Sequence, residues 1–424
     1  MHPTPLPTHA HPQTGAQLPP TVAGAAPSRS PGWCAWQPRL AVLALVAAVA
    51  GCGGGGSPAD SVATATPVSA FTQGTITGLG SIIVNGVRFD ESSASVTDDD
   101  GTQRSATALA LGMRVAVDSG AVDAATVSAH AAALRYGSLV LGPVAAVDRA
   151  ATSLTVLGQV MNLRGITVFS HSLWAGLSAV SVGAVVEVHG LLNAATGHLT
   201  ATRIESAAGA TAYKWRGMVG ALDTVARTFM LNGTGVSYAR LAASAVPDKL
   251  ANGATLRVLL ATAQSGGMWV AQSLGVKGSK PHDSAAALVR GSITAFTSSA
   301  SFSVDGLAVD ASAADSPDGS AGLALGVAVE VQGRMRNAVL VASRVDVESR
   351  HLGDDGHAWQ LFGAISAANA ATKTFVVRAT TVSYGDTTYV NGNLADLVVG
   401  RKVHVKGAVG STRSQVQAAT VTFK

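Results

Sequence analysis

A glycine followed by an alternating strand recurs along the chain and constrains its fold more than any other feature. In the clearest copy, residues 325–333 read Leu-Gly-Val-Ala-Val-Glu-Val-Gln-Gly. Alternation of apolar and polar residues predicts a strand with one buried face. Five copies at a spacing of about 70 residues predict an array of small β domains rather than a short-repeat solenoid. The other copies are Leu111–Val117, Val182–Gly190, Asn252–Val258 and Val399–Gly407.

Each repeat begins with a Gly-x-Ile or Gly-x-Val triplet, and two short apolar runs follow it. Asn85-Gly86 and Asp305-Gly306 separate these runs in the first and fourth units, and both residue types accept the positive φ of a tight hairpin. The fifth unit lacks this turn signal and reads Arg378-Ala379. The opening triplets are Gly74–Ile76, Gly142–Val144, Gly217–Val219, Gly291–Ile293 and Gly363–Ile365.

Later in each unit, the pattern predicts a short helical turn, the glycine-led strand and a closing strand. Leu109–Leu111 and Leu394–Leu397 are expected helical turns, and Ala342–Val347 is an expected closing strand. In the first unit the closing stretch runs into an Ala-rich segment that ends at Leu134, where a helix is the alternative. The expected fold class is therefore all-β.

A sheet of five or six short strands avoids exposed edges best by closing into a barrel. We therefore expect a tandem array of five small OB-like β-barrel modules, with a small sandwich as the alternative. Residues 1–51 are expected to be a leader and signal peptide, and residues 52–70 a lipidated, flexible tether. The expected modules are residues 71–135, 136–206, 215–276, 288–348 and 360–424, with polar linkers after the second, third and fourth.

The combined motifs Gly-x-Ile, Phe-x-Val-x-Gly, Leu-x-x-Gly-x-x-Val-x-Val-x-Gly and Ala-x-x-Ile resemble a bacterial family of repeated lipoprotein modules, the domain of unknown function 5666. The fourth unit is the most similar, the second and fifth are close, and the first and third diverge. The matching residues are turn glycines and core aliphatics. The resemblance therefore implies a fold, and it transfers no catalytic residue.

The N-terminal region has the features of a lipoprotein signal. Leu40–Ala50 is an apolar run that suits a signal-peptide core and is too short to span a bilayer. It leads to Gly51 and Cys52, and Val49–Cys52 resembles a lipobox. The resemblance implies cleavage before Cys52, acylation of this residue by lipid such as palmitate, and, with Gly53 next, an outer-membrane location. The alternative is an ordinary signal peptide with a chance cysteine.

Charge and cysteine content narrow the classes of partner. The formal charge of +4 falls towards neutrality once Arg29 and Arg39 leave with the signal peptide, and no Lys/Arg run stands out. The chain therefore lacks the electrostatic footprint of a nucleic-acid-binding protein. Only Cys52 of the two cysteines remains after cleavage, which excludes an internal disulfide or a cysteine-based metal site.

Candidate sites for chemistry are few, and no nucleophile elbow or phosphate-binding loop is found. Asp98–Gly101 lacks the alternate acids of a calcium loop, so it is interpreted as an acidic turn. His189 and His404 alternate with core valines and are expected to point to solvent. No cofactor is expected. Weak metal-ligand candidates share one loop, where a solvated linker is the favoured interpretation: His351, Asp354, Asp355 and His357.

Four tryptophans, Trp174, Trp215, Trp269 and Trp359, follow the expected cleavage site. Trp215 and Trp359 stand just before the opening glycines of the third and fifth units. Their shared offset favours a role in joining neighbouring modules, and a stacking platform for sugars or bases is the alternative.

The expected function is that of a non-catalytic binding or structural protein of the cell envelope, attached to the membrane by its N-terminal lipid. An envelope protein or polysaccharide is the expected partner, and repeated modules suit multivalent binding. The alternatives are a hydrolytic enzyme with a site between modules and a carbohydrate-binding protein. A nucleic-acid binder follows from fold analogy alone, and the near-neutral charge opposes it.

Overall fold

The computed structural model describes residues 69–275, 281–317, 319–348, 359–409 and 415–424. These residues form 28 strands and six short 3-10 helices, and they contain no α-helix. None of the helices found in these ranges has the length and apolar character needed to cross a membrane. The predicted all-β fold class is confirmed.

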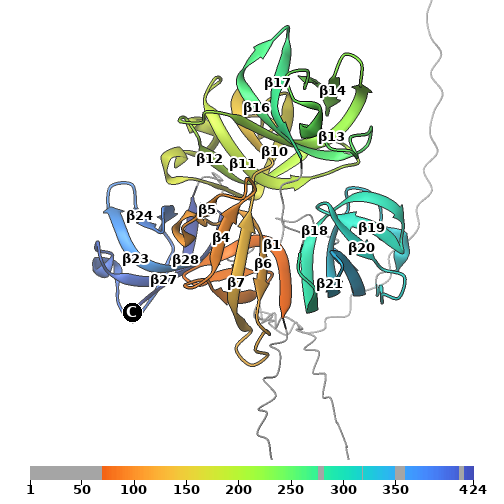
Figure 1. Cartoon of the computed structure of the whole chain (residues 1–424). Coiled ribbons are helices and arrows are strands. Elements are labelled where there is room, and N and C mark those ends of the chain that lie inside the picture. The colour runs from red at the N-terminus through yellow and green to blue at the C-terminus, as the bar shows by residue number, and fades with distance from the viewer. Residues whose placement is uncertain (1–68, 276–280, 318, 349–358, 410–414) are drawn as a thin grey trace, which may run out of the picture. The chain divides into compact units, whose positions relative to one another are not determined.

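The fourth module illustrates the architecture (Figure 1). Its strands are β18 (Ser284–Ser298), β19 (Ser301–Val304), β20 (Leu307–Asp310), β21 (Ala328–Arg336) and β22 (Val339–Val347). They pair in the order β18-β19-β20-β22-β21, and β21 pairs again with β18. All these pairs are antiparallel except β20 with β22, which are parallel. The sheet closes into a five-stranded OB-like barrel, as predicted, rather than a sandwich.

The other modules close in the same way. Module 1 has β1 (Ala70–Leu79), β2 (Ile82–Val84), β3 (Val87–Asp90), β6 (Arg114–Ser119) and β7 (Ser128–Tyr136), with an added hairpin of β4 (Ser95–Asp98) and β5 (Gln103–Arg104). Module 2 has β8 (Val140–Asp148), β9 (Ser153–Val156), β10 (Gln159–Phe169), β11 (Val185–Leu192) and β12 (Leu199–Ser206).

Module 3 has β13 (Tyr213–Asp223), β14 (Thr228–Leu231), β15 (Thr234–Ser237), β16 (Thr255–Ser265) and β17 (Met268–Leu274). Module 5 has β23 (Trp359–Asn369), β24 (Thr374–Val377), β25 (Thr380–Ser383), β26 (Thr388–Val390), β27 (Lys402–Val409) and β28 (Val416–Phe423).

A short helix precedes the fourth barrel strand in every module. The helices are η1 (Ala106–Ala108), η2 (His171–Leu173), η3 (Gly176–Ala179), η4 (Ala243–Ala245), η5 (Ser320–Gly322) and η6 (Leu394–Asp396). The predicted helical turn is therefore present, although in module 1 it lies just before Leu109–Leu111. The helical alternative for the Ala-rich stretch of module 1 is wrong. Residues 128–136 form β7 because this segment is needed to close the barrel between β3 and β6.

The repeated strand alternates as its sequence predicts. In β21, Val329 and Val331 are fully buried, whereas Glu330 and Gln332 are partly exposed. Gly333 then marks a β-bulge, where the carbonyl oxygen of Val341 on β22 comes closer than any Cβ atom would allow. The motif needs glycine here because the backbone of the closing strand occupies the space of a side chain.

The first hairpin of each barrel turns through positive φ. Asp305 and Gly306 have φ values of 48° and 85° in module 4. Arg378 and Ala379, where the sequence lacks a turn signal, have φ values of 48° and 55°. The tight turn is thus kept in module 5, because pairing of β24 with β25 imposes it on residues that do not favour it.

Strand pairing also joins different modules in the described part of the chain. β1 runs parallel to β18 through Ala70–Gln73 and parallel to β23 through Gly78 and Leu79. β13 is antiparallel to β8 at Lys214 and Trp215. Apolar cores follow these junctions, since one cluster contains residues of modules 1 and 5 and another contains residues of modules 2 and 3.

Candidate functional site

The acidic turn between β4 and β5 is built around Asp98, which is only 6% exposed. Its Oδ1 accepts hydrogen bonds from the backbone N–H groups of Asp100 and Thr102, both at 2.9 Å. Its Oδ2 accepts one from Arg104 Nε at 2.8 Å. Asp98 therefore shapes the turn, which confirms the interpretation of Asp98–Gly101 as an acidic turn.

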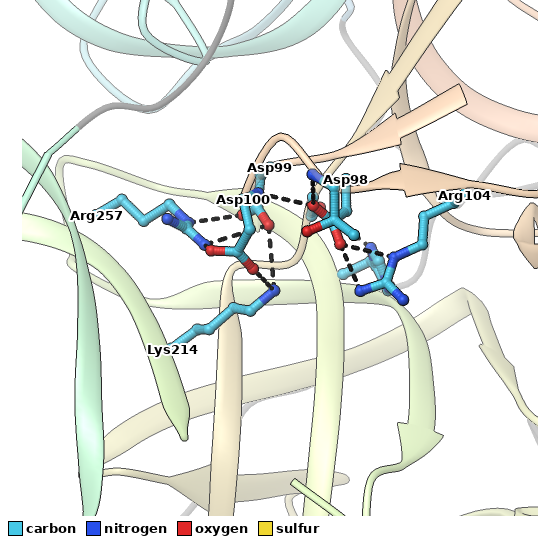
Figure 2. A network of polar contacts seen from close by, with 9 residues as sticks. Asp98, Asp99, Asp100, Arg104, Lys214 and Arg257 are labelled. Carbon is cyan, nitrogen blue, oxygen red and sulfur yellow. Dashed lines mark hydrogen bonds and ion pairs between the residues drawn. The ribbon is translucent and has the colours of Figure 1, made fainter. Parts of the chain in front are cut away.

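The next two carboxylates of the turn reach module 3 (Figure 2). Asp99 lies 3.3 Å from Lys214 Nζ and 2.9 Å from Arg257 Nε, and Asp100 lies 2.7 Å from Lys214 Nζ. Asp100 also pairs with Arg257. Two anions and two cations thus form a closed network between the modules, and the side chains of Asp99 and Arg257 are at most 9% exposed.

This network changes the pKa values of Asp100 and Lys214. Burial alone would raise the pKa of Asp100, but hydrogen bonds from Lys214 and Arg257 outweigh it and lower the pKa below its ordinary value. Burial alone would lower the pKa of Lys214, and the two carboxylates raise it instead. Asp100 and Lys214 are therefore held in their charged forms across the neutral pH range.

A cavity of about 550 Å³ lies beside this network and is lined by residues of modules 1 to 4. Four arginines line it: Arg114, Arg135, Arg216 and Arg257. The volume is in the range of pockets that enclose small molecules. Apolar residues, including Phe71, Leu139 and Leu192, make up other parts of the wall.

Three hydrogen-bonding groups on the cavity wall have no protein partner within the described ranges. Arg135 donates from Nη1 to Asp118 at 2.8 Å, but its Nη2 is buried without a partner. Ser138 Oγ is also buried without one. The guanidinium of Arg216 makes no hydrogen bond or ion pair within these ranges, whereas Arg114 and Arg257 pair with carboxylates. A buried polar group without a partner costs free energy, so such groups concentrate where a ligand supplies the partner.

Arg216 is the least compensated charge of the cavity. It lies directly opposite Arg257 in the pairing of β13 with β16, so two like charges are neighbours. Burial lowers the pKa of Arg216. The charge of Arg257 lowers this pKa further, whereas Asp99 and Asp305 raise it. An anion bound here would offset the cost of burying the charge of Arg216 and its repulsion with Arg257.

A second polar cluster covers the outer face of the β11–β12 hairpin. Glu187 stands opposite Glu205, and His189 stands opposite Arg203. The ligand atoms of Glu187, His189 and Glu205 all lie within 4.8 Å of one another. Arg203 donates from Nε to Glu205 and from Nη1 to the carbonyl oxygen of Leu111 at 3.1 Å.

The prediction that His189 points to solvent is wrong, because its exposed fraction is 0%. The strand alternates as expected, but Gly137, which lies between β7 and β8, contacts the outer face, and its carbonyl oxygen is 3.1 Å from His189 Nδ1. His404 is half-buried and lies 3.2 Å from Gln360 Oε1. Burial, followed by the charges of Lys406, Arg88 and Lys424, lowers the pKa of His404.

The family model titled Domain of unknown function (DUF5666) matches three regions of the chain, residues 142–205, 290–346 and 362–421. These regions fall in modules 2, 4 and 5, the three units whose motifs are most regular. Modules 2, 4 and 5 are therefore similar to this family. Modules 1 and 3 have the same barrel closure but lie outside the matched regions.

Comparison of the chain with curated proteins found no match. Among solved structures, it is similar to one titled "drosophila Unr CSD456", with 16% sequence identity over 51% of this chain and 98% of that chain. The TM-score is 0.14, a value that carries no argument about fold or function.

Several predicted sites lie outside the described residues. These are Cys52, with the signal peptide and tether, and the loop of weak metal-ligand candidates, His351, Asp354, Asp355 and His357.

The tryptophans fall into two groups. Trp215 and Trp359 are fully buried in barrel cores. Trp215 lies at the β13–β8 junction and Trp359 lies beside the β1–β23 junction, as expected of residues that join neighbouring modules. Trp269 is 9% exposed, and its ring meets Tyr213 edge-on. Trp174 is 49% exposed at the end of η2 and is the one tryptophan of the described part that solvent reaches freely.

Sequence reasoning missed the cavity and the buried histidine cluster. Arg114, Arg216 and Arg257 occupy outward positions of barrel strands, where a charged residue ordinarily contacts water. The available signal was weak: Lys214, Arg216 and Arg257 give module 3 a cationic outer face, and Asp98–Asp100 is an anionic turn. Complementary charges on two modules indicate a junction between them.

Proposed function

We propose that this protein is a non-catalytic binding protein of the cell envelope, anchored by lipid at Cys52, and that its inter-module cavity binds an anionic group. One observation carries the binding proposal: Arg135 and Ser138 have buried polar atoms without a partner among the described residues, on the wall of the cavity that Arg216 also lines. Arginine guanidinium groups match the geometry of carboxylate and phosphate, which they bind through paired hydrogen bonds.

The wall of the cavity favours an acidic sugar of an envelope polysaccharide as the ligand. Two arginines supply donors for a carboxylate, and a serine hydroxyl pairs with a sugar hydroxyl. The apolar side chains of Phe71, Leu139 and Leu192 provide a surface for the carbon skeleton. The net positive balance of the four lining arginines over Asp98, Asp99 and Asp305 opposes a cationic ligand.

Calorimetric titration of the full chain with glucuronate, and separately with inorganic phosphate, tests the binding proposal. We expect glucuronate to bind at one site per chain, with an affinity that falls as salt concentration rises. Neutral glucose at the same concentration serves as the ligand control, because it lacks the carboxylate.

Substitution of the unpaired arginine locates the site. Arg216→Met keeps the length of the side chain and removes its charge, so glucuronate binding should weaken roughly 10- to 100-fold. Arg149→Met is the matched control, because Arg149 is exposed on a turn of module 2 and does not line the cavity. Equal weakening by both variants, or none by Arg216→Met, would show that the cavity is not the site.

The lipid anchor has a separate test. The sequence around Cys52 supports acylation of its thiol, and stable attachment of a lipoprotein uses more than one acyl chain. We expect intact-mass analysis of the membrane fraction to show a chain that begins at Cys52 and carries acyl mass. The Cys52→Ala variant should move to the soluble fraction, and its continued fractionation with outer membranes would contradict the anchor.

A further inference from the structure

Two carboxylates oppose each other on the outer face of module 2. Glu187 on β11 is the direct cross-strand neighbour of Glu205 on β12. Like charges in this position destabilise a sheet unless a cation lies between them. Arg203 donates to Glu205, whereas Glu187 has no ion-pair partner among the described residues, and Lys214 acts on it only from a greater distance.

A buried imidazole completes this arrangement. His189 lies two residues after Glu187, on the same face of β11, and its exposed fraction is 0%. Its Nδ1 is 3.1 Å from the carbonyl oxygen of Gly137, which can only accept a hydrogen bond, so Nδ1 carries the proton. Nε2 is then a lone-pair donor, and it is buried without a hydrogen-bond partner in the described part of the chain.

We propose that Glu187, His189 and Glu205 form a binding site for a divalent transition-metal ion, with Zn²⁺ as the ion that best fits the ligands. Their ligand atoms already lie within 4.8 Å of one another. Imidazole nitrogen and carboxylate oxygen are ordinary zinc ligands. A carbonyl group that holds the second nitrogen of a metal-binding histidine is a recurrent feature of such sites, because it fixes the tautomer and the ring orientation.

The setting of the cluster suits an ion that enters from solvent. Glu187 and Glu205 are partly exposed, whereas His189 lies beneath them. Arg203 binds one oxygen of Glu205, so the second oxygen is available to a metal. None of the three proposed ligands lines the cavity beside module 3, although Gly137, which contacts His189, does.

Module 4 contains the same arrangement with one decisive difference. Glu330 stands opposite Asp346, and Gln332 stands opposite Arg344 in the position of the histidine. Gln332 donates from Nε2 to Glu330 at 3.0 Å, and Arg344 donates to both oxygens of Asp346 at 2.7 Å. Protein groups thus bind both carboxylates of module 4, whereas Nε2 of His189 in module 2 is buried without a partner among the described residues.

Zinc titration of the full chain, without an affinity tag and after chelation of bound metal, tests this proposal. We expect the wild type to bind one more equivalent of Zn²⁺ than the His189→Gln variant, or to bind that equivalent at least about 100-fold more tightly. The glutamine is the residue that module 4 has at this position, so the variant is expected to fold. Co²⁺ should give d–d absorption bands in the wild type that His189→Gln removes.

Two further variants make the outcome decisive. The double variant His351→Ala/His357→Ala removes the histidines of the loop before module 5 and should keep the zinc equivalent that His189→Gln loses. Glu187→Gln removes a partly exposed ligand and should weaken the same equivalent, and it replaces His189→Gln if that variant does not fold. Equal zinc binding by the wild type, His189→Gln and Glu187→Gln would overturn the proposed site. Loss of the zinc equivalent only in His351→Ala/His357→Ala would also overturn it.

Discussion

Fourteen residues other than glycine adopt positive φ in the described chain, and one group of them performs the same task in each barrel. The first residue of each hairpin turn belongs to this group: Asn85, Leu157, Asn232, Asp305 and Arg378, with φ between 43° and 50°. Glycine follows in four modules and Ala379 follows in the fifth. An L-residue in this region costs roughly 1–2 kcal/mol, so the turn of module 5 is the most strained of the five.

Backbone strain in these hairpin turns predicts opposite effects for a substitution in module 5 and one in module 4. Ala379→Gly should raise the free energy of unfolding by about 1 kcal/mol, because glycine accepts a φ of 55° without a Cβ penalty. Gly306→Ala should lower it by about the same amount, since a Cβ atom there meets nothing within 4 Å and only the backbone is strained. Urea unfolding followed by circular dichroism measures both, and destabilisation by Ala379→Gly would contradict the account.

Single residues also show the limit of sequence reasoning. Alternation correctly assigned Val329 and Val331 to the core and Glu330 to the outer face. The same reasoning placed His189 in solvent, but the segment between β7 and β8 contacts its outer face. Periodicity predicts on which face of a strand a residue lies. Contacts with other parts of the chain determine whether that face is exposed to solvent.

At the scale of elements, the glycine that ends the repeated strand is a packing requirement. Gly190, Gly333 and Gly407 each follow a shift of register, and each lies against a carbonyl group of the closing strand. Modules 1 and 3 shift register at Ser119 and Leu260 without a glycine. The bulge is therefore common to all five barrels, and close approach of the backbone is particular to three of them.

This close approach predicts a large effect for one methyl group. Gly333→Ala should destabilise the protein by about 2 kcal/mol or more, because the new Cβ collides with the main chain at Val341, which cannot rotate away. Gly322→Ala in the same module is the control, since its Cβ would meet Val347 at an ordinary 3.4 Å. Thermal unfolding of the two variants should differ clearly, and equal melting temperatures would refute the bulge requirement.

The elements themselves were largely predictable from the sequence. Hairpin signals, helical turns and glycine-led strands located the barrels, because each is set by local backbone preference. The fifth turn was missed, since Arg378 and Ala379 have no preference for it and pairing of β24 with β25 imposes the conformation. The Ala-rich strand β7 was ambiguous because alanine favours helix locally, while closure of the barrel requires a strand.

At the scale of the whole molecule, charge complementarity joins module 1 to module 3. Asp99 and Asp100 of the β4–β5 turn meet Lys214 and Arg257 of the β13–β16 face (Figure 2). The side chain of Arg257 is 5% exposed, so loss of its partners would leave a buried charge unpaired. Such a loss destabilises more than the pair itself stabilises.

The lowered pKa of Asp100 predicts a pH dependence of unfolding. The folded pKa lies below the ordinary value of 3.8, so the carboxylate stabilises the protein fully above about pH 4, and this contribution is lost as the pH falls through the folded pKa. Asp100→Asn should therefore lower the melting temperature at pH 7 and have little effect at the acidic end. Asp386→Asn, at an exposed position, is the control, and parallel profiles for wild type and Asp100→Asn would contradict the role of the network.

Contacts between modules could not be predicted from the sequence. The length of a linker predicts contact only between modules that are consecutive in the sequence. Strand β1, however, pairs with strands of modules 4 and 5. The residues that form the cavity and the histidine cluster lie on outward strand positions that differ from repeat to repeat. These sites form where the surfaces of two modules come into contact. The sequence of a single repeat does not indicate which surfaces those are.

The pairing of β1 has a consequence for how the protein is made. The edges of β1 that receive β18 and β23 remain unpaired until the last two modules have folded. An unpaired edge is a template for another chain. The yield of folded protein is therefore expected to depend on chain concentration and chaperone supply more strongly than the stability of the finished molecule would indicate.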